Sequence, residues 1–303
     1  MTGSQQHFAD RLFEAVERKR SHVVVGLDPD YELLPPGLRG SFPPPDQATA
    51  EDKAECFRVF LVSLLERLRD EAVAVKPQVA YFEALGPVGY ALYAEIVARA
   101  KEMGYLVIAD VKRGDIGSTA EAYARGHLEV VGADAVTVNP YLGSDGLRPF
   151  FQRARDQGKG VFVLVKTSNP SSAELQDLAL SSGEPLYRRV AELVDGWGRG
   201  TEGARGYRSI GAVVGGTHPS QGAELREVLR GVPLLIPGYG AQGAQAADVA
   251  RMFDGEGLGA VVNSARAILY AYRKHPELSW EEAAAREAHE MRMALWKVAG
   301  REQ

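Results

Sequence analysis

The feature that most constrains the fold is a regular alternation of short apolar runs with longer stretches of helical spacing along almost the whole chain. The apolar runs have the length of buried strands. We place them at His22–Val25, Val73–Val79, Tyr105–Lys112, Ala133–Asn139, Gly160–Lys166, Ile210–Val214, Leu234–Ile236 and Gly259–Val262. Strands that alternate with helices predict βαβ units and therefore a parallel sheet.

A stretch of helical spacing follows each of these runs. The predicted helices are Glu51–Asp70, Pro87–Met103, Ser118–Val131, Asp145–Gln157, Glu184–Trp197, Pro219–Arg230, Gln242–Met252 and Ser264–Arg273, with a final one at Trp280–Val298. Ser118 and Glu121 have the spacing of a capping box. Eight strand–helix pairs predict an α/β fold, a closed (β/α)8 TIM barrel with extra N- and C-terminal helices, rather than an open doubly wound sheet.

Composition limits the domain count and the class of partner. The 303 residues show no sharp change in composition, so residues 1–303 are predicted to form a single barrel domain. A net charge of -5 argues against a broad surface for a nucleic acid polymer. No apolar stretch approaches a membrane span, and Met1 to Arg20 lack the apolar core of a secretory signal. The single cysteine, Cys56, excludes an intramolecular disulfide, and a cytoplasmic location is the simplest expectation.

In a barrel of this kind the functional residues lie at the carboxyl ends of the strands. The candidates are therefore the polar residues that end or closely follow the apolar runs: Asp28; Lys76 and Gln78; Asp110, Lys112 and Asp115; Asn139; Lys166, Thr167 and Ser168; Gly238 to Gln242; and Asn263 to Arg266. Two long loops, 34–47 and 168–183, also follow apolar runs. We expect both loops at the functional rim.

Strand parity brings several of these charges together. Residues two apart share a face of a strand, so Asp110 and Lys112 point the same way, as do Lys76 and Gln78. Neighbouring strands would then place two lysines beside one aspartate. Buried charges must be paired, and Asp115 could supply a fourth charge that makes the cluster neutral.

The third strand end carries a motif with a family resemblance. Ala109-Asp110-Val111-Lys112-Arg113-Gly114-Asp115-Ile116-Gly117-Ser118-Thr119 resembles the signature of the orotidine 5′-monophosphate decarboxylases. Further matching segments occur in the family's order: Leu27-Asp28-Pro29, Lys76-Pro77-Gln78, Lys166-Thr167-Ser168-Asn169-Pro170, Pro237-Gly238-Tyr239-Gly240-Ala241-Gln242-Gly243 and Asn263-Ser264-Ala265-Arg266. The long loops and terminal helices resemble the longer bacterial subgroup.

The resemblance implies a reaction and a role for each matching residue. The family removes CO₂ from orotidine 5′-monophosphate to give UMP, in pyrimidine synthesis, without a cofactor or metal. Lys76, Asp110, Lys112 and Asp115 match its Lys-Asp-Lys-Asp array, with Lys112 as the proton donor to carbon 6. The implied substrate contacts are Asp28 for ribose, Ser168 in preference to Thr167 for the pyrimidine, and Gln242, Arg266 and the amides around Gly238 and Gly240 for phosphate, with Gln78 as a further substrate-binding residue. In this family Asp115 and Thr119 reach a neighbour's site, so a homodimer with shared sites is implied.

Each residue alone also has a plainer interpretation. Asp28 could be a turn residue before Pro29, Ser118 a helix cap, Asp115 an exposed turn residue, and Lys76 a lysine that reaches solvent. Gly238 to Gly243 also matches G-x-G-x-x-G. A proline precedes it and no acid follows at the usual offset, so a phosphate loop is favoured over a dinucleotide site. The turn Gly215-Gly216-Thr217-His218 could contact a ligand or be only a turn.

Two other functions remain open from the sequence. Sister barrels share Asp-x-Lys-x-x-Asp and act on sugar phosphates with Mg²⁺, so a metal-dependent lyase or decarboxylase is one alternative. Arg113-Gly114, Ile116 to Thr119 and the segment Thr167 to Asn169 argue against it. The other is a non-catalytic nucleotide-binding protein. Such a protein would be expected to lose charges from a costly buried cluster, and here all of them are present.

Overall fold

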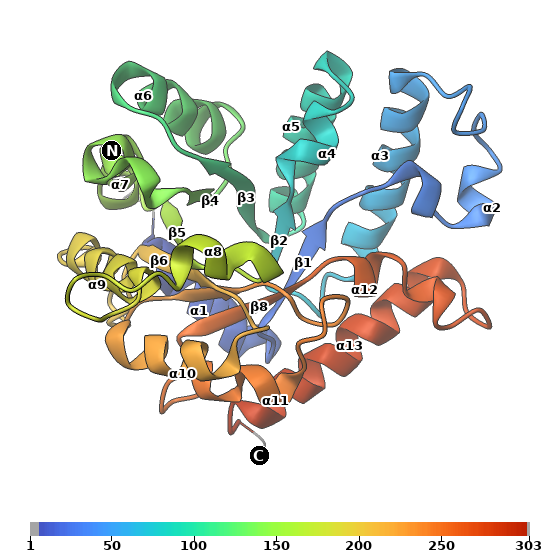
Figure 1. The fold of residues 1–303 in the computed structure, drawn as a ribbon. Helices are drawn as coiled ribbons and strands as arrows, with labels where there is room; N and C mark the ends of the chain where they lie inside the picture. Colours follow the sequence, from blue (N-terminus) through green and yellow to red (C-terminus); the bar gives the residue numbers. More distant parts are fainter. Residues whose placement is uncertain (1–5, 302–303) are drawn as a thin grey trace.

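Eight parallel strands close into a barrel in the order β1 to β8, in a computed structural model that describes residues 6–301 (Figure 1). The strands are β1 Val23–Leu27, β2 Ala74–Pro77, β3 Leu106–Arg113, β4 Ala135–Val138, β5 Gly160–Lys166, β6 Ile210–Val214, β7 Leu234–Ile236 and β8 Ala260–Ser264. The predicted (β/α)8 TIM barrel is confirmed. Residues 1–5 and 302–303, part of the predicted single domain, lie outside the described residues.

Helices surround this barrel. They are α1 Phe8–Lys19, α2 Pro36–Arg39, α3 Ala50–Arg67, α4 Val79–Glu83, α5 Pro87–Glu102, α6 Gly117–Arg125, α7 Ser144–Asp156, α8 Ala173–Gln176, α9 Leu186–Gly198, α10 Pro219–Val228, α11 Ala246–Val249, α12 Arg266–Leu269 and α13 Trp280–Val298. A π-helical turn, Gly126–Val130, continues α6. Within residues 6–301, the longest helices are too polar to cross a bilayer.

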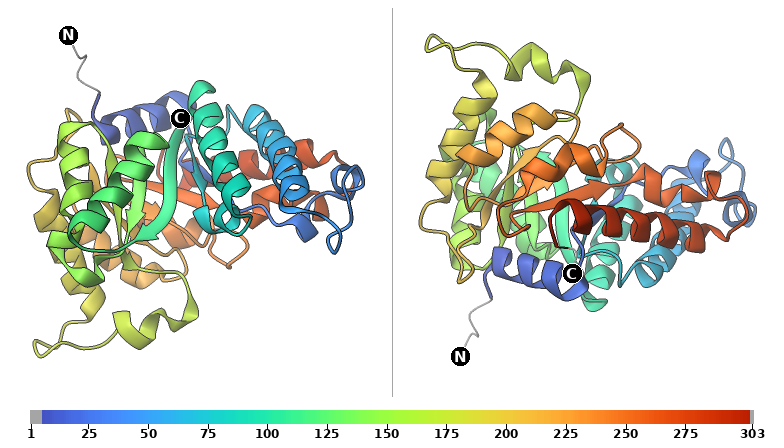
Figure 2. Two further views of the ribbon diagram at one scale, coloured as in Figure 1. Left: turned by 90° about the horizontal axis from the view of Figure 1, so that it is seen from above. Right: turned by 90° about the horizontal axis from the view of Figure 1, so that it is seen from below.

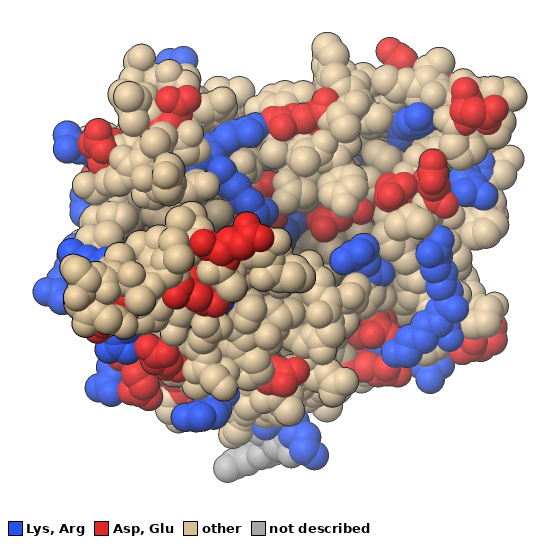
Figure 3. All heavy atoms as spheres, in the orientation of Figure 1, with Lys and Arg blue, Asp and Glu red and all other residues tan. Residues whose placement is uncertain are grey.

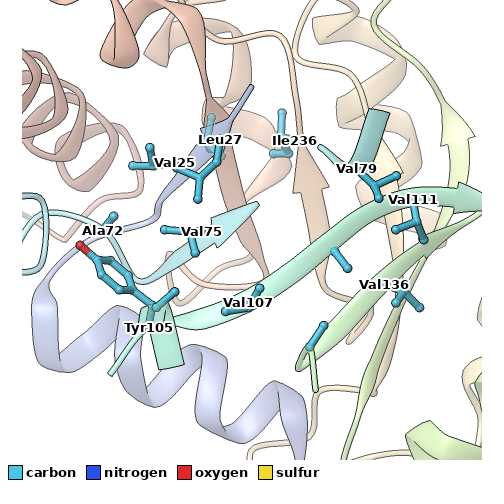
Figure 4. Packing of buried hydrophobic residues seen from close by; sticks show 14 of the residues in the cluster. Val25, Leu27, Ala72, Val75, Val79, Tyr105, Val107, Val111, Val136 and Ile236 are labelled. Carbon is cyan, nitrogen blue, oxygen red and sulfur yellow. The ribbon is translucent and has the colours of Figure 1, made fainter. Parts of the chain in front are cut away.

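Strand alternation divides the core into two layers. Outward side chains such as Val25, Val75, Val107 and Val136 pack beneath the helices (Figure 4). Inward side chains near the strand starts, including Val24, Ala74, Ile108 and Phe162, form a second cluster with Phe8, Leu12 and Phe13 of α1. The extra N-terminal helix therefore covers the amino-terminal end of the barrel, on the same side as part of α13 (Figure 2). The carboxyl ends of the strands, where a functional site is expected, lie at the opposite end of the barrel.

The predicted capping box at Ser118 is wrong. The N-cap of α6 is Ile116, and no side chain caps this helix, because Gly117 adopts φ +53 and opens the helix one residue earlier. The Glu121 side chain is bound instead by Arg153, with 2.6 Å between Nη2 and Oε1. Capping boxes occur at other helices, with Thr49 at α3 and Ser279 at α13.

Several predicted boundaries are also corrected. The second strand stops at Pro77, and Val79 begins α4, because Gln78 turns its side-chain oxygen to cap the Ala80 N–H. After β7, the helix begins at Ala246 rather than Gln242, since glycines at positive φ shape the preceding loop. After β8, the strand includes Ser264, and the predicted helix 264–273 is reduced to α12 and a 3₁₀ turn.

Candidate active site

A cavity of about 580 Å³ opens at the carboxyl ends of the strands. Most of the predicted site residues line it: Asp28, Lys76, Gln78, Asp110, Lys112, Thr167, Ser168, Gly238, Gln242 and Arg266. Asp115, Thr119 and Gly240 are not among its lining residues. Residues from β1, β2, β3 and the loops after β5, β7 and β8 therefore converge as parallel-strand geometry requires.

Asp110 is the centre of the charged cluster. Its Oδ2 accepts hydrogen bonds from Lys76 Nζ at 2.5 Å and Gln78 Nε2 at 3.1 Å. Its Oδ1 accepts from Lys112 Nζ at 2.6 Å and Thr137 Oγ1 at 2.9 Å. The predicted same-face placement is confirmed for Asp110 with Lys112 and for Lys76 with Gln78. Four donors on one buried carboxylate fix both its position and its charge.

The ionisation of the cluster follows from this geometry. Burial alone would raise the pKa of Asp110, but the adjacent charges of Lys76 and Lys112 and their hydrogen bonds outweigh it and hold the pKa well below its usual range. Burial would likewise lower the pKa of Lys76, and the carboxylates of Asp110 and Asp28 reverse that effect and raise it. Both groups are charged at neutral pH, and two fixed ammonium groups face the cavity.

Lys112 sits on strained backbone. Its φ is 43°, in the left-handed region that side chains other than glycine rarely adopt. The β3–β4 register shifts between Ala109 and Arg113 at this point. The Thr137 hydroxyl accepts both the Val111 and Lys112 N–H groups at 3.0 Å, which compensates the interrupted ladder. Strain of this kind is retained where the surrounding structure aims a functional side chain.

Sequence reasoning missed Thr137. It noted Asn139 at the end of the fourth strand, yet the Asn139 side chain caps the following turn by accepting from the Tyr141 N–H. Thr137 lies two residues earlier and therefore shares a strand face with Asn139. It lines the cavity and is only 1% exposed. Parity applied to β4, as it was to β2 and β3, was the signal that could have found it.

Two polar atoms beside the cluster have no partner among the described residues. They are Asp28 Oδ1 and Asn263 Oδ1, both buried in the wall of the cavity. Burial raises the pKa of Asp28, with the neighbouring charge of Asp110 also raising it and Lys76 opposing. Buried acceptors without donors are costly, so this wall is suited to a ligand that brings hydroxyl donors.

The end of β5 distinguishes Thr167 from Ser168. The Thr167 hydroxyl donates to Asn169 Oδ1 at 2.7 Å and accepts from Gln176 Nε2 at 2.8 Å. Ser168 lines the same cavity, and its hydroxyl makes no hydrogen bond to the described residues. Ser168 is thus the residue whose hydroxyl is free to meet a ligand.

The loop after β7 forms the glycine-rich edge of the cavity. Gly238 and Gly240 have φ of 102° and 74°, which side chains disfavour. A Cβ at Gly238 would lie 3.2 Å from Gln242 Oε1, so glycine allows Gln242 to fold over the loop. Arg266 begins α12 opposite this loop. Its guanidinium forms no ion pair or hydrogen bond within residues 6–301. A free cation beside a glycine-rich loop suits an anionic group.

Two of the predicted residues that do not line the cavity, Asp115 and Thr119, belong to the segment that leads from β3 into α6. Asp115 is partly buried, and its Oδ1 accepts from the Ile116 N–H at 2.8 Å; Thr119 is exposed on α6. Large apolar side chains near them are exposed, with Ile116 at 56%, Tyr141 at 78% and Leu142 at 47%. Within one chain, Asp115 therefore does not complete the charged cluster.

The described residues contain one group of side chains with the spacing of metal ligands. Three such side chains, His275, Glu287 and Glu290, lie together, but they belong to α13 and its preceding turn rather than to the cavity. Lys274 already lies 2.7 Å from Glu287 and 3.8 Å from Glu290. In the cavity itself, both oxygens of Asp110 are occupied by donors, a poor arrangement for a cation.

The face of the molecule drawn in Figure 3 has no extended positively charged patch that would suit a polyanion. Lys and Arg alternate there with Asp and Glu, and no single-sign patch covers it (Figure 3). The fold, the lysine–aspartate cluster and the glycine-rich rim define a (β/α)8-barrel enzyme with a small-molecule site at the carboxyl ends of its strands.

Comparison with known proteins identifies the family. The profile of the orotidine 5′-phosphate decarboxylase / HUMPS family matches residues 21–283, and the chain belongs to this family. A curated orotidine 5′-phosphate decarboxylase of Rhodopirellula baltica is 42% identical over 91% of this chain and 94% of its own. One of Clostridium perfringens is 39% identical over 95% and 97%. A solved structure of Leishmania donovani OMP decarboxylase has 33% identity and a TM-score of 0.74, covering 96% of this chain and 99% of that one.

Proposed function

We propose that this enzyme decarboxylates orotidine 5′-monophosphate to UMP without a cofactor. The observation that carries the proposal is the Lys76–Asp110–Lys112 cluster in the wall of the cavity, in which Lys76 and Asp110 are buried and Lys112 is partly exposed. Family membership and the names of the relatives support the same reaction. A cytoplasmic setting stays a prediction from the single cysteine.

The reaction needs a cation at the reacting carbon. When the bond between carbon 6 and the carboxylate breaks, its electron pair stays on carbon 6 and CO₂ leaves. The Lys112 ammonium, held by Asp110 at 2.6 Å, would stabilise that anion and then transfer a proton to it. Solvent reprotonates the lysine afterwards. Asp110 is fixed as an anion, so it would repel the substrate carboxylate while orienting both lysines.

The rest of the cavity accommodates the rest of the nucleotide. Asp28, with its unpartnered Oδ1, would accept a ribose hydroxyl. Ser168 would bind the polar edge of the pyrimidine, because the Thr167 hydroxyl is already engaged. Gln242, Arg266 and the amides near Gly238 would hold the phosphate. Binding energy from that remote group can be used to order the site.

We also propose that two copies share their sites. Asp115 and Thr119 lie outside their own chain's cavity, beside the exposed Ile116, Tyr141 and Leu142. Association through this apolar area would cover these side chains and could bring Asp115 of one chain to the other chain's cluster. This would supply the fourth charge that the single chain lacks.

The two alternative functions predict different behaviour in one assay. The assay follows the ultraviolet absorbance change of orotidine 5′-monophosphate with purified protein, with and without EDTA. We expect turnover that EDTA does not change. Turnover abolished by EDTA would favour a Mg²⁺-dependent enzyme on the same barrel. Binding of UMP without any turnover would favour a non-catalytic nucleotide-binding protein and overturn the proposal.

A further inference from the structure

Lys166 is a fully buried charge that the proposed mechanism does not use. A register shift between Leu164 and Lys166 turns its side chain away from the cavity. Its Nζ lies 2.6 Å from Asp177 Oδ1 and 5.7 Å from the centre of the Tyr187 ring of α9. A buried ammonium needs a charged partner. This partner belongs to the loop 168–183, next to the end of α8.

The same short segment also binds Thr167, the residue that directly follows β5. The Thr167 N–H donates to Gln176 Oε1 at 2.9 Å, and Gln176 Nε2 donates to Thr167 Oγ1 at 2.8 Å. Two consecutive loop residues, Gln176 and Asp177, therefore hold two consecutive strand-end residues, Thr167 and Lys166. The residue that follows is Ser168, which lines the cavity and whose hydroxyl makes no hydrogen bond to the described residues.

The other side of Ser168 is held by the turn after β6. The Thr217 hydroxyl donates to the Ser168 carbonyl at 3.1 Å, and His218 Nε2 lies 3.2 Å from the Thr167 carbonyl. A Cβ at Gly215 would lie 2.8 Å from Ser168 Cα, so this turn approaches closely only as glycine. Gly215 to His218 thus supports the backbone of Ser168, and these residues are not among those lining the cavity.

We propose that Lys166 and Asp177 are positioning residues for recognition of the pyrimidine. Their ion pair keeps α8 folded onto β5, so that Gln176 binds Thr167 and Ser168 is aimed at the base. If the loop lifted, Lys166 would lose its carboxylate while still buried, and the pair therefore acts as a latch. The ligand part of this inference rests on the proposed function. The latch itself does not.

The test compares Lys166→Met with Lys159→Met. Lys159 is a matched control, because it is also a buried lysine and directly precedes β5 at its other end, where Nζ donates to the Ala133 carbonyl. Hydrogen exchange at the Thr167 amide reads the latch directly. We expect faster exchange there in Lys166→Met and no change in Lys159→Met.

A second measurement reads the effect on ligands. Inhibition by UMP is compared with inhibition by ribose 5-phosphate, which has no pyrimidine. We expect Lys166→Met to weaken inhibition by UMP about tenfold, which corresponds to the loss of roughly one well-placed hydrogen bond. Inhibition by ribose 5-phosphate should stay within about twofold of its wild-type value. A merely structural lysine would affect both ligands equally.

Asp177→Asn keeps the proposal testable if Lys166→Met does not fold, since it removes only the charge of a partly exposed residue. Unchanged exchange at Thr167, or equal weakening of both ligands, would overturn the inference. The proposed function would fail differently. Wild-type protein would then not turn over orotidine 5′-monophosphate, whether or not it binds UMP, while faster exchange at Thr167 in Lys166→Met would still establish the latch.

Discussion

At the scale of single residues, the proposed reaction depends on how Asp110 holds two lysines. Its four donors come from β2, β3 and β4 or their ends, so the carboxylate connects three neighbouring strands. Each lysine is positioned by a bond to a fixed anion rather than by its own flexible chain. This arrangement keeps a proton donor ready without disorder, as electrostatic preorganisation requires.

Lys112→Ala should lower kcat by several orders of magnitude, because the anion at carbon 6 would lose both its counterion and its proton donor. The fold should survive, since this side chain is 45% exposed. Steady-state kinetics together with circular dichroism would check both points. Turnover close to that of the wild type would remove Lys112 from the role assigned to it.

Thr137→Val should lower kcat by about 10- to 100-fold while KM changes less. Valine keeps the shape but removes a donor to Asp110 and the acceptor for the Val111 and Lys112 N–H groups. The strained backbone at Lys112 would then relax and misplace the ammonium. Thr137→Ser, which retains the hydroxyl, serves as the control and should keep most of the activity; equal loss in both variants would contradict this account.

At the scale of elements, loops and helix starts follow local capping chemistry more than spacing. The Ser118 spacing predicted a capping box, and the glycine before it moved the helix start. At α13 the Ser279 hydroxyl accepts from the Glu282 N–H at 3.2 Å, and Glu282 accepts from the Ser279 N–H at the same distance. The N-terminus of α13 is thus stabilised by the side chains of its own first turn.

Ser279→Ala should reduce the free energy of unfolding by about 1 kcal/mol, the usual cost of a lost N-cap. Ser118→Ala is the matched control, because Ser118 caps no helix here and its loss should cost less than about 0.5 kcal/mol. Urea unfolding would measure both. If the two substitutions cost the same, the capping assignment at one of the two helices is incorrect.

At the scale of the whole molecule, buried histidines make stability depend on pH. Burial lowers the pKa of His22 to about 4 from a model-compound value of 6.5. The unfolded chain therefore binds a proton at a higher pH than the folded chain does. The contribution of neutral, buried His22 to the free energy of unfolding is fully present above pH 6.5 and is lost as the pH falls through about 4.

The expected loss from His22 over that range is roughly 3 kcal/mol. His22→Phe should therefore flatten the decline in unfolding free energy between pH 7 and pH 4, whatever its effect at pH 7. Urea titrations at several pH values would measure the two slopes. His127, whose pKa burial also lowers to about 4, stays in both proteins and cancels in the comparison. Parallel curves would exclude His22 as a source of the pH dependence.

Shared sites make a prediction about mixed assemblies. Lys112→Ala and Asp115→Asn should each impair turnover when assayed alone. In a heterodimer of the two, one site would carry both changes and the other would carry none. Random mixing should therefore restore about one quarter of wild-type activity, because half of the dimers would be mixed and each would hold one intact site. No recovery after demonstrated subunit exchange would rule out the shared site.

Local patterns in the chain were enough to predict the barrel and the convergence of charged residues at one end of it. Periodicity specifies which segments are strands, and strand parity places Lys76, Asp110 and Lys112 on facing positions, since both are local properties of the chain. The remaining site residues were predicted from the family resemblance, which rests on the order of the motifs along the chain. These features depend on few residues at a time, so they can be read without knowing the packing.

Which hydroxyls and charges lack a partner became known from the packing of distant segments against one another. Thr137 lines the cavity because β4 lies beside β3. Lys166 was predicted at the site but does not line the cavity, because a register shift turns the end of β5. Ser168 differs from Thr167 because Gln176 binds the Thr167 hydroxyl and amide. Gln176 reaches the end of β5 only because the loop folds back onto it. Such outcomes depend on contacts between segments far apart in the chain, and local pattern carries no information about which donor meets which acceptor.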